Sequence, residues 1–136
     1  LWTFAAASHP LAGRARLDLA ELGALPWVLQ PAPSPMRQLI DSAFATAGLR
    51  TLDNLVETTS ITATVNLVRH AGMISVLPST IVAQEVASGA FVRLPVDVRG
   101  ALEPYGIVTR KDVPPTPNAV EFLAIMRSLV AGGRTV

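Results

Sequence analysis

LVETTSITATVNLVRHAGMISVLP, residues 55 to 78, contains in succession an apolar strand pattern, a polar turn, a helix pattern and a second apolar strand pattern. The polar run Glu57 to Ser60 leads the strand directly into the helix. In an open α/β sheet, the carboxyl end of a strand and the amino end of the next helix meet at the crevice where ligands bind. Here that junction carries hydroxyl groups instead of the glycines of a nucleotide loop, which predicts a small-molecule binding module.

Length and composition indicate one domain with a sizeable core. The chain has 136 residues, of which 50% are hydrophobic and 15% charged. This is apolar for a soluble domain, so we expect some of the apolar surface to meet a partner. The net charge of +1 comes from scattered residues without a basic run, whereas nucleic-acid binding requires clustered cations.

Several classes of site are disfavoured. The chain has no cysteine, and neither of its two histidines lies near another ligand-type residue at metal spacing, so we predict no metal and no cofactor. No apolar run approaches the roughly 18 residues of a membrane span, and the start of the chain does not resemble a signal peptide. Because the chain lacks an initiator Met, we expect it to be a piece of a longer protein.

Alternation of strand and helix patterns continues along the chain. It predicts an α/β fold with a mostly parallel sheet and flanking helices. The expected strands are Leu1 to Ala7, Trp27 to Gln30, Asn54 to Glu57, Met73 to Leu77, Phe91 to Leu94 and Tyr105 to Arg110. The expected helices start after Ser34, after Thr59 or Ser60, after Ser79 and after Thr116, with one short helical turn near Asp18 to Leu22.

Two of these helix starts are candidate ligand contacts. The helix after Ser34, with Pro35 at its first position, and the helix after Ser60 each follow a strand, so a parallel sheet would bring both amino ends to the same edge. Free N–H groups at a helix start suit an anion such as a carboxylate. The alternative is that both serines only cap their helices, although Thr58, Thr59 and Thr62 supply more hydroxyls than one cap needs.

The order and spacing of several short motifs resemble the effector-binding domain of LysR-type transcriptional regulators. The motifs cover nearly the whole chain: His9-Pro10-Leu11-Ala12, Asp18-Leu19, Ser34-x-x-Arg37, Glu57-x-x-Ser60 with Leu67-Val68, Val76-Leu77-Pro78, Gly89 before Val92-x-Leu94-Pro95, and Thr109-Arg110 before a proline-capped helix. Many members have Gly-x-Gly where Gly72 stands alone here. The VETTS run and the proline-rich loop look closer to regulators of sugar-binding-protein and aromatic-acid catabolism genes.

The resemblance implies a fold like that of type II periplasmic binding proteins, with two α/β subdomains and a cleft between them. Residues 26–108 would form the complete second subdomain, and residues 1–25 and 109–136 would be remnants of the first. The resemblance also implies that the effector contacts in this chain are Pro33, Ser34, Thr59, Ser60 and Ile61, with no catalytic residue.

The resulting hypothesis is a cytoplasmic, ligand-sensing domain of a bacterial transcription factor. It would bind a small, anionic metabolite, would self-associate as a homodimer or tetramer, and would meet DNA only through an N-terminal helix-turn-helix domain absent from this chain. Arg37 could pair with an effector carboxylate or with Asp41 one helical turn away, of which the second is favoured. The rival interpretations are a type II solute-binding protein of a transport system and an enzyme on the same fold.

Overall fold

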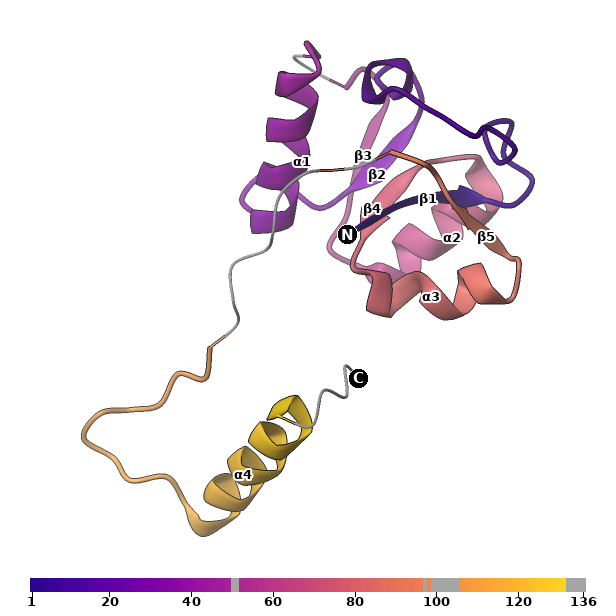
Figure 1. The fold of residues 1–136 in the computed structure, drawn as a ribbon. Helices are drawn as coiled ribbons and strands as arrows, with labels where there is room; N and C mark the ends of the chain where they lie inside the picture. The colour runs from indigo at the N-terminus through magenta and orange to yellow at the C-terminus, as the bar shows by residue number, and fades with distance from the viewer. Residues whose placement is uncertain (50–51, 97, 99–105, 132–136) are drawn as a thin grey trace. The chain divides into compact units, whose positions relative to one another are not determined.

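The computed structural model describes residues 1–49, 52–96, 98 and 106–131. It divides into two compact units, Leu1–Leu102 and Glu103–Val136. The first unit contains, in chain order, β1 (Trp2–Ala6), η1 (Leu19–Leu22), β2 (Trp27–Leu29), α1 (Pro35–Thr46), β3 (Leu55–Glu57), α2 (Ile61–Ala71), β4 (Ser75–Leu77), α3 (Ser79–Ala87) and β5 (Phe91–Arg93) (Figure 1). The second contains α4 (Pro117–Ala131).

The strands form two sheets that adjoin each other. One has the order β4-β1-β5, with β1 antiparallel to both neighbours, and the other pairs β2 with β3 in parallel. The sheets are joined where Trp27 forms a parallel bridge with Ile74, whose carbonyl accepts the Val28 N–H at 3.0 Å. All described strands except β1 therefore run in one direction, as the predicted α/β fold with a mostly parallel sheet requires.

The position of β1 corrects the predicted division of the chain. Residues 1–25 were assigned to a different subdomain from residues 26–108, yet β1 lies between β4 and β5, and its Phe4 and Ala5 are fully buried. Because its central residues are buried in the sheet, β1 does not supply the apolar surface that we expect to meet a partner. A single sequence shows that a run is apolar enough to be a buried strand, but not which sheet accepts it.

Two groups of helices cover the sheets. In Figure 1, α2 and α3 lie next to each other, and α1 lies beside β2 and β3. Across the core, the Trp27 ring meets the edge of Phe44 with centroids 5.2 Å apart, and its indole N–H donates to the Leu22 carbonyl at 2.8 Å. Burial of both rings fixes α1 on β2, since each removes a large apolar area from water.

α1 buries Met36, Ile40 and Phe44, which recur at the helical period and form one apolar stripe. Gly48 ends the helix in the left-handed region at φ +82°, where a side chain would be strained. The third helix begins one residue earlier than predicted, because Ser79 is its first residue and Pro78 its cap, without a side-chain cap hydrogen bond.

The second unit differs from prediction in one element. Residues 106–110 are not a strand and are exposed, while Tyr105 lies outside the described residues. Apolar composition alone does not make a strand, because a strand needs a partner for its backbone groups. α4 forms as predicted, with the Ala119 N–H 3.4 Å from the Thr116 hydroxyl, and none of its side chains is buried.

Candidate functional site

The predicted ligand contacts lie where two adjacent parallel strands end. β2 leads into the loop before α1, and β3 leads through Thr58 into α2. The register pairs Leu29 with Glu57, and the Thr58 N–H donates to the Leu29 carbonyl at 3.0 Å. The starts of α1 and α2 therefore share one sheet edge, which is where open α/β sheets bind ligands.

Ser34 is half-buried and occupies the N-cap position of α1, but its side chain does not cap the helix. Its hydroxyl instead contacts the side-chain carbonyl oxygen of Gln30. The cap-only interpretation of Ser34 is thus wrong for this structure. Because Pro35 has no N–H, the Met36 and Arg37 N–H groups are the first backbone donors of this helix.

Ser60 does cap α2. Its hydroxyl accepts a hydrogen bond from the Ala63 N–H at 3.2 Å, while its own N–H donates to the Thr58 hydroxyl at 3.1 Å. The Thr64 hydroxyl donates to the Ser60 carbonyl at 3.1 Å. The hydroxyls of Thr59 and Thr62 are then the ones in this turn that take no part in the cap. The cap that the sequence predicted is confirmed, and it does not exclude a ligand contact because a hydroxyl oxygen has a further lone pair and a proton.

The other predicted contacts are open to solvent. Pro33, Thr59 and Ser60 are exposed. Ile61 has 45% of its surface accessible, although it follows the same helical period as the buried Thr64 and Val68. An exposed isoleucine at a helix start leaves apolar surface beside the hydroxyl-bearing turn. A ligand with both a polar and an apolar part would match this pair of surfaces.

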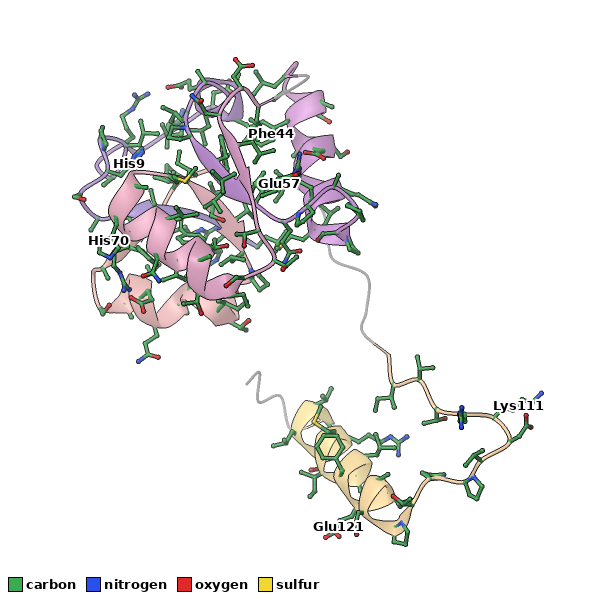
Figure 2. The ribbon with its side chains drawn as sticks, turned by 180° about the vertical axis from the view of Figure 1, so that it is seen from behind. His9, Phe44, Glu57, His70, Lys111 and Glu121 are labelled. Carbon is green, nitrogen blue, oxygen red and sulfur yellow. The ribbon has the colours of Figure 1, made fainter. Side chains whose placement is uncertain are left out.

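Arg37 connects the two helix starts. From the first turn of α1, its Nη1 lies 3.1 Å from the Gln30 carbonyl and 2.6 Å from a carboxylate oxygen of Glu57 at the end of β3. Its Nε lies 2.7 Å from the Asp41 carboxylate, which confirms the favoured helix pairing. Figure 2 shows Glu57 beside α1. Only 12% of the Arg37 side chain is exposed, against about half of each carboxylate partner.

Arg37 and its two carboxylate partners together carry a net negative charge. Burial alone would lower the pKa of Arg37, but hydrogen bonds and charge from Asp41 and Glu57 outweigh it and raise the pKa above its ordinary value. One guanidinium thus faces two carboxylates. An incoming anion would meet those carboxylates before the cation, so anion recognition at this edge relies on hydroxyl and backbone N–H donors.

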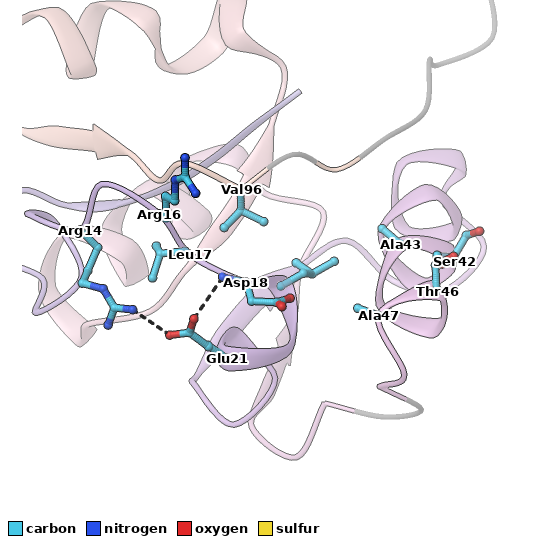
Figure 3. A pocket seen from close by; sticks show the side chains of 11 residues that line it. Arg14, Arg16, Leu17, Asp18, Glu21, Ser42, Ala43, Thr46, Ala47 and Val96 are labelled. Atoms are coloured by element: carbon cyan, nitrogen blue, oxygen red, sulfur yellow. Dashed lines mark hydrogen bonds and ion pairs between the residues drawn. The ribbon is translucent and has the colours of Figure 1, made fainter.

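A cavity of about 720 Å³ lies elsewhere in the first unit, between the segment before η1 and the outer side of α1 (Figure 3). One wall carries Arg14 and Glu21, which pair at 3.1 Å. The other wall carries Ser42 and Thr46. None of the predicted ligand contacts lines this cavity.

Other chemistry is sparse in the part of the chain that the structure describes. No cluster of three or more His, Asp or Glu residues there could hold a metal. None of the helices in those residues is long and apolar enough to span a bilayer. His9 accepts a hydrogen bond through Nδ1 from the Leu11 N–H at 3.2 Å, which is a turn contact.

Sequence reasoning missed Gln30. Its backbone carbonyl is held by Arg37 and its side chain by Ser34, so it stands at the centre of the edge between the two helix starts. The available signal was its position as the first polar residue after the buried strand β2, the same criterion that singled out Thr58 to Ser60 after β3.

Comparison with known proteins agrees with this geometry. Residues 1–131 match the family model described as LysR substrate binding domain. The chain is 33% identical over 122 residues to the HTH-type transcriptional regulator GalR of Pseudomonas putida, covering 90% of this chain and 30% of that protein. It is 29% identical over 121 residues to the HTH-type transcriptional regulator GbpR of Azospirillum brasilense, covering 88% and 35%.

A solved structure described as the effector binding domain of QuiR in complex with shikimate has a TM-score of 0.60 to this chain. It is 25% identical in sequence, and the alignment covers 90% of this chain and 57% of that one. The chain spans about a third of the length of the curated regulators it matches. The relatives are transcriptional regulators and not transport proteins. On the match over residues 1–131, this chain belongs to the LysR substrate-binding domain family, which has the α/β fold of type II periplasmic binding proteins.

Proposed function

We propose that this chain senses a small, anionic metabolite for a LysR-type transcription factor, and that Pro33, Ser34, Thr59, Ser60 and Ile61 form one wall of its effector site. The observation that supports this most strongly is the placement of two hydroxyl-bearing helix starts at one edge of parallel strands, next to exposed apolar surface. The shikimate bound by the QuiR domain is a hydroxylated carboxylic acid, which is the chemical class we propose here.

Affinity arithmetic requires a second wall. A micromolar ligand needs about −8 kcal/mol, while a hydrogen bond to a charged group contributes about 1.5–3 kcal/mol. Two open helix starts fall short of this value. We propose that a first subdomain, to which residues 109–136 belong, closes over the ligand, and that residues 1–98 belong to the second subdomain.

Cleft closure would carry the signal to DNA. The ligand shifts the population of open and closed states only to the extent that it binds one of them more tightly. The closed state would change the angle between subunits, and with it the spacing of N-terminal helix-turn-helix domains on DNA. DNA would thus be bound by the full-length protein and not by this chain.

We also propose a sensing role without catalysis or a cofactor, in the cytoplasm. The family match supports this, since effector-binding domains of regulators are not typically enzymes. Self-association as a dimer or tetramer is supported by the apolar composition of the chain, of which 50% of the residues are hydrophobic and 15% charged. Light scattering on the full-length protein tests this: a strict monomer at high concentration contradicts it.

A thermal shift screen of the full-length protein tests the proposed function. Organic acids, including shikimate, and sugars are added singly to the wild type and to the Ser60→Ala and Ser34→Ala variants. We expect at least one acid to raise the melting temperature of the wild type and to have a smaller effect on both variants. The proposal fails if no compound stabilises the wild type while Ser60→Ala leaves induction of the regulated genes intact.

A further inference from the structure

The Arg37 guanidinium has more partners than an ordinary surface ion pair. It contacts a backbone carbonyl at the end of β2, a carboxylate at the end of β3 and a carboxylate on its own helix, at 3.1, 2.6 and 2.7 Å. The first two contacts join segments 7 and 20 residues away in sequence. Only Asp41 is a neighbour within the helix.

Each of the two long-range contacts lies next to a predicted ligand contact. The side-chain oxygen of Gln30 contacts the Ser34 hydroxyl, and the backbone carbonyl of Gln30 accepts a hydrogen bond from Arg37. Glu57 precedes Thr58, whose N–H reaches the Leu29 carbonyl and whose hydroxyl receives the Ser60 N–H. The chain of contacts therefore runs from Ser34 through Gln30, Arg37 and Glu57 to the start of α2.

The Arg37 guanidinium is suited to holding these segments together and unsuited to binding the effector itself. Its planar fork offers donors in fixed directions, so several acceptors can be held at once, which a lysine ammonium does less rigidly. Its contacts with Asp41 and Glu57 leave the site with one positive and two negative charges. A carboxylate ligand at Arg37 would face both.

We propose that Arg37 is a positioning residue that holds the Ser34 loop and the Thr59–Ile61 turn in one fixed arrangement, so that a single effector can contact both. This rests on the proposed function for its ligand, but its geometric part is independent of ligand identity. A site divided between two loops binds well only when the loops are already held in the bound arrangement.

The test uses hydrogen exchange and shikimate titration on the full-length protein. Arg37→Met keeps much of the apolar stem and removes all three contacts, and Glu57→Gln removes only the negative charge from the contact between β3 and α1. Asp41→Asn is the matched control, because it removes a carboxylate of similar exposure that pairs with Arg37 only within α1. Exchange is followed in peptides covering residues 55–62, and in peptides covering residues 74–78 of the core as a reference for global stability.

We expect Arg37→Met to speed exchange in residues 55–62 about five-fold, because it removes the contact that holds Glu57, at the end of β3, to α1. Glu57→Gln should speed exchange there to a smaller degree, and Asp41→Asn should have little effect because its pair with Arg37 lies within α1. Residues 74–78 should be unchanged in all three. The proposal is overturned if Arg37→Met leaves residues 55–62 unchanged, if both regions accelerate equally, or if Asp41→Asn matches Arg37→Met.

Shikimate affinity provides the second measurement. If the wild type binds shikimate, Arg37→Met should weaken binding about five-fold while Asp41→Asn does not; equal affinity in wild type and Arg37→Met overturns the proposal. If the wild type does not bind shikimate, exchange alone decides the role of Arg37. Failure of the proposed function is recognised separately, by the absence of any stabilising acid in the thermal shift screen.

Discussion

Replacement of Ser60 by aspartate separates the capping role of this residue from its proposed ligand role. Aspartate retains an oxygen that can accept from the Ala63 N–H, as the serine hydroxyl does at 3.2 Å. A negative charge at the start of α2 also interacts favourably with the helix dipole, by about 0.3–1 kcal/mol. We therefore expect Ser60→Asp to equal or exceed the wild type in stability, whereas Ser60→Ala loses about 1 kcal/mol with the cap.

Ser60→Asp should have the opposite effect on effector binding, because it should weaken the affinity for an anion. Two unit charges about 4 Å apart repel by about 4 kcal/mol at an effective dielectric constant of about 20. Such a repulsion corresponds to a loss of affinity of roughly a thousand-fold. Ser60→Asp should thus be a stable protein that no longer responds to the acid selected in the thermal shift screen.

The assay combines urea unfolding with ligand titration of the full-length protein. Ser88→Asp is the charge control, because Ser88 is exposed at the carboxyl end of α3 and its hydroxyl contacts the Glu85 carbonyl. It adds the same charge and should leave affinity for the acid unchanged. The reasoning is refuted if Ser60→Asp binds the acid as well as the wild type, or if Ser88→Asp loses binding to the same degree.

Three further predictions concern the scaffold. Phe44→Ala should cost about 3–5 kcal/mol in urea unfolding, because it empties the space against the buried Trp27 ring; a loss below about 1 kcal/mol would contradict this packing. Gly48→Ala should cost about 1 kcal/mol, because residue 48 has φ +82°, whereas Gly13→Ala, where nothing lies within 4 Å and no positive φ occurs, should be nearly neutral. Burial lowers the pKa of His9 below 6.5 despite an opposing contact with the Gly72 backbone, so the unfolded chain binds the proton more readily. The contribution of His9 to the free energy of unfolding is then fully present above about pH 6.5, and it is lost as the pH falls through the lower pKa that His9 has in the folded state. His9→Asn, which keeps an acceptor for the Leu11 N–H, should reduce the difference in urea midpoint between about pH 7.5 and about pH 5.5, and an unchanged difference would exclude His9 as its source.

The helices of this fold follow closely from the sequence. The stripe of α1, the Ser60 cap and the glycine after α1 are local features, and local hydrogen bonds and side-chain periodicity decide them. β1 illustrates what local patterns do not contain. Its apolar run predicted a buried strand, but its place between β4 and β5 depends on pairing with residues more than 70 positions away.

Some features of the candidate site could likewise be predicted from the sequence, and others could not. The hydroxyl-bearing helix starts were visible in the sequence, since each follows a strand pattern directly. The role of Gln30 and the contact from Arg37 to Glu57 were not, because they depend on the parallel register of β2 and β3 and on the direction of one long side chain. The unexpected exposure of Ile61 has a similar origin: the helix period includes it in the apolar stripe, but the first turn of α2 extends beyond the core.

The most direct test of the central claim is the structure of the full-length protein with the acid selected in the thermal shift screen. We predict that the carboxylate or hydroxyl groups of the ligand lie within hydrogen-bonding distance of the Ser34 and Ser60 side chains, at the shared edge of β2 and β3. A ligand found instead in the cavity between Arg14 and Thr46, with both serines free, would contradict the claim.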